Sequence, residues 1–549
     1  MKIHPTLIAI VLIALSSCNS KTKVDQLFYN GKIYTVDSSF TIAEAMVVTD
    51  GKIIAVGSND ELTSLYEPEK SIDVSGKYIY PGFHDSHCHF YGYGVDKAKI
   101  NVTGTNSFEE VLTIVKNNED KQFCRWVFGR GWDQNDWVEK EYPTNHKLDS
   151  LFPDVPVILL RVDGHAALLN SKGLELASLN AKTKIEGGKI ILQNGKPTGI
   201  IMDNAIDAVY DVMEKISREA SEEALLKAQS DCFSVGLTSV TDAGYQNGGL
   251  ANSIINEIEA LHSNGQLIIR VNAMARLEEI DLYRSTGRTT KGRLKVNGFK
   301  AYADGALGSR GACLLEPYSD YPESHGMLLS TPDQLRSWFE EVHEIGMQMN
   351  VHCIGDSSHR FVLKEYSNIL KGSNTNRWRI EHAQVIAPGD LEYYRNSGII
   401  PSVQPTHATS DMYWAEDRVG INRIKGAYAY QSLLECNGMI LTGSDFPVES
   451  INPLFGFYAA VARKDQQQYP EGGFLSQESL SREDALKAMT IWSAYGAFNE
   501  DITGSIEPGK FADFVILEED LMESNESELF NINVNETWVE GELVYKREE

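Results

Sequence analysis

The stretch Pro81-Gly82-Phe83-His84-Asp85-Ser86-His87-Cys88-His89 has the pattern of an apolar strand that ends in two histidines. Side chains at positions i and i+2 of a strand point to the same face of the sheet. His87 and His89 can therefore chelate one metal ion at the end of this strand. This spacing also occurs by chance. The alternative is that both are surface histidines, and the rest of the chain has to distinguish the two interpretations.

Strand-like apolar runs recur through the middle of the chain, and helical patterns separate them. The runs are Ile79–Asp85, Thr238–Asp242, Ile268–Ala273, Val296–Tyr302, Gln348–His352, Arg379–His382, Ser402–Gln404 and Ile440–Asp445. The helical patterns include Arg218–Val235, Thr331–Gly346 and Ser481–Phe498. This alternation predicts an α/β protein with a parallel (β/α)8 barrel of the TIM type. Two further runs, Lys97–Val102 and Val157–Val162, raise the number of candidates above eight, and the sequence does not show which runs form the barrel.

The flanks of the chain are rich in short strand patterns. Residues 24–80 contain several, with the hairpin-turn signals Asn30-Gly31 and Asp50-Gly51, and residues 500–549 contain more. Neither flank is long enough for a complete β domain, so we predict that the two combine into a composite β-sandwich beside a barrel of residues 81–499. Residues of about 120–205 fit the alternation worst, and we interpret them as an insertion over the barrel mouth.

The N-terminus has the features of an export signal. Lys2 and His4 precede an apolar run over residues 6–15, and Leu15-Ser16-Ser17-Cys18 follows. A cysteine in this position resembles a bacterial lipoprotein processing site. We therefore expect residues 1–18 to be a signal peptide, Cys18 to carry a lipid that is the only membrane contact, and the catalytic body to face the periplasm. The alternative is an uncleaved helical anchor.

Composition restricts the class of partner. The 549 residues are 42% apolar and 23% charged, which is typical of a globular protein. A formal net charge of -27 repels phosphate backbones, so we expect a small-molecule substrate and no nucleic acid. The six cysteines after Cys18 contain no CxxC pair, which argues against a zinc ribbon, and we expect most of them to be small buried residues.

Three more residues of metal-ligand type stand at the ends of predicted strands, namely His352, His382 and Asp445. In a β/α barrel the C-terminal ends of the strands form the active-site face. One buried histidine is more often a satisfied core residue. So many ligand types on one rim, however, indicate a metal site.

Lys300 interrupts the strand-like run around it. A lone buried ammonium group is costly, so this lysine must be paired or modified. If burial deprotonates the amine, it can add carbon dioxide and become a carbamate, which is a carboxylate able to bridge two metal ions. The alternative is an ion pair with Asp304 or Asp445.

Five stretches together resemble the amidohydrolase superfamily, in the branch that contains N-substituted formamide deformylases. They are Gly82–His89, Phe299–Arg310, Asn350–Asp356, Ile380–Gln384 and Gly443–Val448. The resemblance extends from about Val24 to the C-terminus. It implies a β/α barrel with a composite β-sandwich, and one or two divalent metal ions, usually zinc.

The resemblance also implies a set of ligands. In the two-metal form, His87, His89 and Asp445 would hold one ion, His352 and His382 the other, and a carbamylated Lys300 would bridge them. His84 stands where many relatives have an apolar residue, and we assign no role to it.

These ligands predict hydrolysis of a C–N bond other than a peptide bond, in an amide, formamide or cyclic amide. A divalent metal activates water and polarises the carbonyl, and Asp445 is expected to accept the water proton and pass it to the leaving nitrogen. Weaker candidates for substrate contact are Trp132, His165, Arg310 and His407. Two alternatives stay open, a non-catalytic binding lipoprotein on the same barrel and a related lyase or isomerase.

Overall fold

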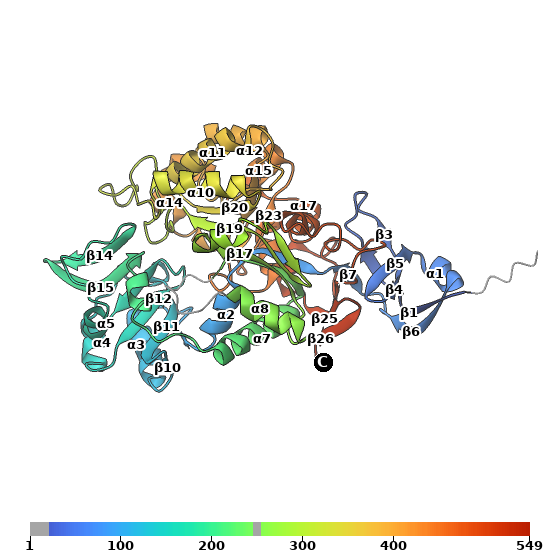
Figure 1. Ribbon diagram of the computed structural model, residues 1–549, viewed down its shortest axis with the longest axis horizontal. Coiled ribbons are helices and arrows are strands. Elements are labelled where there is room, and N and C mark those ends of the chain that lie inside the picture. Colours follow the sequence, from blue (N-terminus) through green and yellow to red (C-terminus); the bar gives the residue numbers. More distant parts are fainter. Residues whose placement is uncertain (1–20, 245–253, 549) are drawn as a thin grey trace, which may run out of the picture.

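The computed structural model describes residues 21–244 and 254–548, so the predicted signal peptide and Cys18 lie outside the described residues. Three regions lie in a row in Figure 1. A β-rich region at one end contains the first strands, a barrel occupies the middle, and a second sheet from residues 100–203 lies at the other end.

Eight parallel strands form a nearly closed barrel. Around it they follow the order β8 (Phe83–Cys88), β16 (Leu237–Asp242), β17 (Arg270–Arg276), β19 (Leu294–Tyr302), β20 (Gln348–Cys353), β21 (Arg379–His382), β22 (Ile400–Val403) and β23 (Leu441–Thr442). Backbone bonds just beyond β23 join the last strand to the first, because Asp445 N donates to His87 O and His89 N donates to Phe446 O, both at 2.8 Å. Each of the eight predicted runs contributes one strand, so the predicted barrel is confirmed.

Helices cover the outside of the barrel, and their ends follow capping chemistry. Helix α7 (Arg218–Ser234) and helix α10 (Pro332–Glu344) match the predicted patterns, and Thr331 with Gln334 forms a capping box before α10. The third pattern differs from the prediction. It is two helices, α17 (Arg482–Ala488) and α18 (Ile491–Gly496), because Thr490 between them leaves the helical conformation at φ -136° and ψ -96°.

The second sheet is inserted between the first two barrel strands in sequence. Its strands are β9 (Ile100–Asn101), β10 (Gln122–Phe123), β11 (Trp126–Trp132), β12 (Val157–Arg161), β13 (Ala166–Leu169), β14 (Gly188–Gln193) and β15 (Lys196–Asp203). The two surplus runs, Lys97–Val102 and Val157–Val162, therefore belong to this sheet and not to the barrel. Apolar clusters cover both faces, one with helix α3 (Phe108–Asn117) and one with helices α5 (Ser171–Leu176) and α6 (Asp207–Tyr210).

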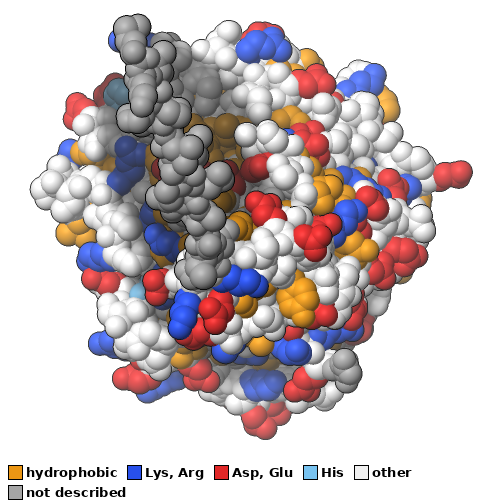
Figure 2. Space-filling model, turned by 90° about the vertical axis from the view of Figure 1, so that its right-hand side faces the viewer, with side chains coloured by type: hydrophobic (Ala, Val, Ile, Leu, Met, Phe, Trp, Pro, Cys, Tyr) orange, Lys and Arg blue, Asp and Glu red, His pale blue; other side chains and the backbone are white. Residues whose placement is uncertain are grey.

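Strands from the two ends of the chain share one sheet. Strands β2 (Lys32–Tyr34), β3 (Ile42–Ala43) and β7 (Tyr78–Pro81) join β24 (Phe514–Leu517), β25 (Val534–Val539) and β26 (Glu542–Lys546). A four-stranded sheet of β1 (Thr22–Tyr29), β4 (Ala45–Thr49), β5 (Lys52–Gly57) and β6 (Tyr66–Asp73) packs beside it through a common apolar cluster that includes Phe28, Met46, Phe514 and Trp538. Acidic and basic side chains are interspersed over the face at this end (Figure 2).

The two predicted hairpin turns have different outcomes. Asp50 and Gly51 both have left-handed φ, 51° and 72°, and they join the antiparallel strands β4 and β5 as predicted. The hairpin predicted at Asn30-Gly31 is wrong. Asn30 does turn the chain at φ 57°, but β1 already pairs with β4 and β6, so β2 passes into the other sheet.

Within the described ranges, no helix combines the length and the apolar character needed to cross a bilayer. The six cysteines of these ranges are all free thiols, and Cys88, Cys232 and Cys353 are buried.

Candidate metal centre

The six predicted ligands meet at the C-terminal rim of the barrel. They are His87 on β8, His89 just after it, Lys300 on β19, His352 on β20, His382 at the end of β21 and Asp445 just after β23. The ring centroids of His352 and His382 are 4.4 Å apart, and those of His87 and His382 are 4.9 Å apart. His87, His382 and Asp445 form the tightest group, with one potential ligand atom from each within 4.8 Å of the others.

Hydrogen bonds orient the two histidines of β8. His87 Nδ1 donates to Glu381 Oε2 at 2.5 Å, and His89 Nδ1 donates to Gly244 O at 2.6 Å. In both rings Nε2 is then the nitrogen that carries the lone pair. His89 Nε2 lies 3.2 Å and His87 Nε2 lies 3.5 Å from Asp445 Oδ1, so both lone pairs face the same carboxylate.

Glu381 is a functional residue that the sequence analysis did not assign. Its side chain is fully buried, and Oε1 accepts from Arg379 Nε at 2.7 Å while Oε2 accepts from His87. Burial opposes ionisation of this carboxyl, but the charge of Arg379 and the hydrogen bond from His87 outweigh it and lower the pKa of Glu381 to about 2. A permanent carboxylate behind His87 fixes the tautomer of that ring and raises its basicity as a ligand.

Asp85 ties the first barrel strand to the segment after the last one. Its carboxylate accepts from Ser444 Oγ at 2.6 Å, from Ser444 N at 3.0 Å and from His87 N at 3.0 Å. A Cβ at Gly443 would lie 2.5 Å from Asp85 Oδ1, so only glycine permits this approach. Asp445 itself has a left-handed φ of 60°, an uncommon conformation that places its carboxylate toward the histidines.

Lys300 lies within this ring of ligands. Nζ is 3.1 Å from His87 Nε2, and among the described residues it forms no ion pair with a carboxylate. The alternative of an ion pair with Asp304 or Asp445 is therefore not formed, and the Asp304 carboxylate instead accepts from the backbone N–H groups of Cys313 and Gly355 and from Ser358 Oγ. Burial lowers the pKa of Lys300 to about 8, with Glu381 and Asp445 opposing the shift.

The centre contains buried polar atoms that lack a partner. They include His352 Nε2, His382 Nδ1 and Asp445 Oδ1. Buried nitrogen and oxygen atoms in proteins are nearly always satisfied, so their convergence needs an explanation. Imidazole and carboxylate groups are the ligand types that zinc and similar divalent cations take, so the residues fit a metal ion.

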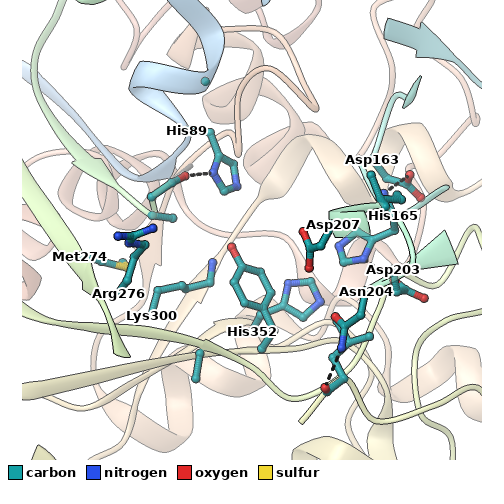
Figure 3. Close-up of a pocket in the computed structure, with 18 of the residues that line it drawn as sticks. His89, Asp163, His165, Asp203, Asn204, Asp207, Met274, Arg276, Lys300 and His352 are labelled. Atoms are coloured by element: carbon teal, nitrogen blue, oxygen red, sulfur yellow. Dashed lines mark hydrogen bonds and ion pairs between the residues drawn. The ribbon is translucent and has the colours of Figure 1, made fainter. Parts of the chain in front are cut away.

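A cavity of about 690 Å³ opens on this centre. Figure 3 shows His89, Lys300 and His352 directed into it from the barrel, with Asp163, His165, Asp203 and Asn204 along the insertion side. The cavity also has apolar wall residues, among them Leu160, Ile206, Met274 and Trp338. Its size suits a small organic molecule.

His165 is the predicted contact residue that the cavity does contain. Its Nδ1 donates to Asp203 Oδ1 at 2.8 Å, and its ring centroid is 5.3 Å from that of His352. Burial opposes protonation of His165, but the hydrogen bond to Asp203 outweighs it and raises the pKa of the imidazole. The sequence analysis missed Asp203, which is far along the chain and reaches His165 only through the pairing of β13 with β15.

The other three contact candidates have different positions. His407 lies beside the centre, with Nε2 3.9 Å from Asp445 Oδ2. Trp132 is not on the cavity wall, since its ring packs in the core of the insertion and Nε1 donates to Leu159 O at 2.7 Å. Arg310 is also outside the cavity and pairs with Asp320 at 2.8 Å. His84 is buried below the rim beside Thr241 Oγ1 at 3.0 Å.

A nearly closed parallel barrel with imidazole and carboxylate groups around one cavity at its C-terminal rim defines a metal-dependent hydrolase. A family model described as "Amidohydrolase family" matches residues 70–545, and the chain belongs to that family.

Relatives match along nearly the whole chain. Protein LONG AFTER FAR-RED 3 of Arabidopsis thaliana is 32% identical, over 95% of this chain and 91% of that protein. The putative amidohydrolase YtcJ of Bacillus subtilis is 31% identical, over 95% of this chain and 99% of that protein. The N-substituted formamide deformylase of Arthrobacter pascens is 25% identical, over 95% and 98%. Among solved structures, an uncharacterized metal-dependent hydrolase from Pyrococcus horikoshii is 29% identical, with a TM-score of 0.74. The match covers 91% of this chain and 99% of that chain. The superfamily resemblance seen in the sequence is thereby confirmed.

Proposed function

We propose that this protein hydrolyses a C–N bond outside peptides, in a small amide, formamide or cyclic amide. The observation that carries the proposal is the meeting of five ligand-type side chains and Lys300 beside one cavity, with buried ligand atoms among them that have no hydrogen-bond partner. The name of the relative from Arthrobacter pascens, an N-substituted formamide deformylase, supports the formamide as a substrate class.

His87, His89, His352, His382 and Asp445 would hold one or two divalent ions, for which we propose zinc. Such an ion supplies an activated water and polarises the carbonyl of the substrate. Residues of the chain supply the proton transfer and hold the ligands in orientation. Asp445 accepts the proton of the attacking water and later delivers it to the leaving nitrogen, while Glu381 holds His87 in orientation.

The test is a panel of N-formyl and N-acyl amines, lactams and dipeptides, assayed with zinc-loaded protein. We expect turnover of at least one non-peptide class, complete loss after chelation, and recovery when zinc is added back, because the proposed mechanism relies on the ion to activate the water. Measured metal content should follow activity. Turnover confined to dipeptides, or full activity without metal, would contradict the proposal. A product that contains no added water would point to a lyase or isomerase, and tight binding of panel compounds without turnover to a binding protein.

We also propose that Lys300 carries a carbamate when metal is bound. An amine of lowered pKa beside His87, with no carboxylate partner, is suited to addition of carbon dioxide. Zinc-loaded protein in isotopically labelled bicarbonate should show a protein-bound carbamate carbon by NMR. Lys300→Ala should lack this signal and lose activity, whereas Lys295→Ala, on the same strand outside the cavity, should keep both. If fully active wild-type protein shows no labelled carbamate carbon, the proposal that Lys300 is carbamylated is wrong.

We further propose that Cys18 carries a lipid and that the catalytic body faces the periplasm. A Cys18→Ser variant that remains in the membrane fraction would contradict the lipid anchor.

A further inference from the structure

Strand β19 brings a second polar side chain to the metal centre. Tyr302 follows Lys300 by two positions, so both side chains leave the same face of the strand. The ring of Tyr302 lies 4.7 Å from Lys300 Nζ, and its centroid is 5.4 Å from that of His352. Tyr302 also lines the cavity, into which Figure 3 shows its neighbours Lys300 and His352 directed.

The hydroxyl of Tyr302 is buried and has no hydrogen-bond partner. This is unusual within the molecule. Buried tyrosine hydroxyls elsewhere donate to protein oxygens, as those of Tyr80, Tyr318, Tyr366, Tyr428 and Tyr430 do. Across residues 21–244 and 254–548, Tyr302 has the only tyrosine hydroxyl that is both buried and unpaired. A buried hydroxyl without a partner costs stability, so its retention at a cavity indicates a partner that arrives with the ligand.

The surroundings define which partner the hydroxyl can take. A phenol keeps its proton at neutral pH, so the hydroxyl of Tyr302 is available as a hydrogen-bond donor. A donor at this position is complementary to an oxygen atom that gains negative charge. In hydrolysis of an amide, that atom is the carbonyl oxygen of the scissile bond, on which charge develops as water attacks.

We propose that Tyr302 is a catalytic residue whose hydroxyl donates a hydrogen bond to the carbonyl oxygen of the substrate as it becomes an oxyanion. This rests on the proposed hydrolysis of a C–N bond. The substrate class is thereby narrowed to compounds with a carbonyl oxygen on the reacting carbon. Aromatic amines and aminopurine-type rings that lack this oxygen gain nothing from Tyr302.

Tyr302→Phe removes only the hydroxyl, and Tyr318→Phe is the matched control. The hydroxyl of Tyr318 is also buried, but it donates to Ala312 O at 2.8 Å and lies outside the cavity. With N-formylbenzylamine and zinc-loaded protein, we expect Tyr302→Phe to lower kcat by about 10²-fold or more with little change in KM. Tyr318→Phe should keep kcat. Thermal unfolding of the metal-free proteins should show the reverse order, with an unchanged or higher Tm for Tyr302→Phe and a lower Tm for Tyr318→Phe.

Binding of methylphosphonate, a tetrahedral anion, gives a readout that needs no turnover. Calorimetry on zinc-loaded protein should show affinity about tenfold weaker in Tyr302→Phe and unchanged in Tyr318→Phe. If the wild type turns over no amide but this difference in binding appears, the proposed function and the catalytic role of Tyr302 fail, while Tyr302 remains a donor to a bound oxyanion. The assignment is overturned if wild type does not bind methylphosphonate, if Tyr302→Phe keeps kcat and affinity, or if its losses follow a loss of zinc.

Discussion

Asp445→Asn is expected to lower kcat/KM by about 10³-fold or more while the protein stays folded. Burial alone would raise the pKa of Asp445, but the imidazoles of His89 and His87 beside it hold the pKa well below its usual range. The carboxylate is therefore ionised and able to accept the proton of the attacking water. An asparagine has almost the same shape and can still approach the histidines, but it cannot take up that proton.

The measurement is steady-state hydrolysis of whichever compound of the panel the wild type uses best, together with metal content. Asp356→Asn is the matched control, because Asp356 is also buried and accepts from Leu315 N at 2.8 Å but lies outside the cavity. It should keep wild-type activity. Equal activity in Asp445→Asn and wild type, at equal metal content, would remove Asp445 from the proton transfer.

Glu381→Ala is expected to reduce the free energy of unfolding by about 3–5 kcal/mol, because it leaves Arg379 charged and buried with no carboxylate. Both side chains are 0% exposed, and they are joined at 2.6 Å. Glu381→Gln keeps the volume and an acceptor for His87. It should fold, yet bind zinc about 10–100-fold more weakly, as expected when the group that orients a ligating histidine is weakened.

Urea unfolding and zinc titration against a chelator of known affinity measure the two effects. Glu500→Ala provides the comparison, since Glu500 pairs with Arg377 at a partly exposed site, 25% exposed on the Glu500 side chain. That pair should contribute about 1 kcal/mol or less, and zinc affinity should not change. Loss of stability in Glu381→Ala no larger than in Glu500→Ala would show that the buried network does not support the rim.

The barrel could be predicted because its strands are buried on both sides and appear in the sequence as continuous apolar runs. The ligands were found for a related reason, since polar residues such as His352 and Asp445 interrupt or end such runs at the rim. The run Val157–Val162 looks like a ninth or tenth barrel strand in the sequence, because β12 is also buried on both faces. Period and composition alone do not tell a strand of one buried sheet from a strand of another.

Residues that act through contacts with distant parts of the chain could not be predicted from such a pattern. Glu381 lies 294 positions from His87, and Asp203 lies 38 positions from His165. Each is polar and buried, but the sequence does not show what it faces. Signals do exist beside the ligands, because Glu381 directly precedes His382 and Tyr302 follows Lys300 by two. Trp132 shows the opposite error, because a tryptophan in the core of a sheet looks the same in sequence as one on a cavity wall.

The barrel closes where its first strand meets the segment after its last one, and the metal centre lies across this junction. Asp85 and Ser444, which hold the junction together, are 359 positions apart. No partly folded chain can assemble the full ligand set, because His87 and Asp445 come together only on closure. Ion binding and completion of the fold would therefore be thermodynamically coupled, because an ion held by His87 and Asp445 would stabilise the closed junction against unfolding.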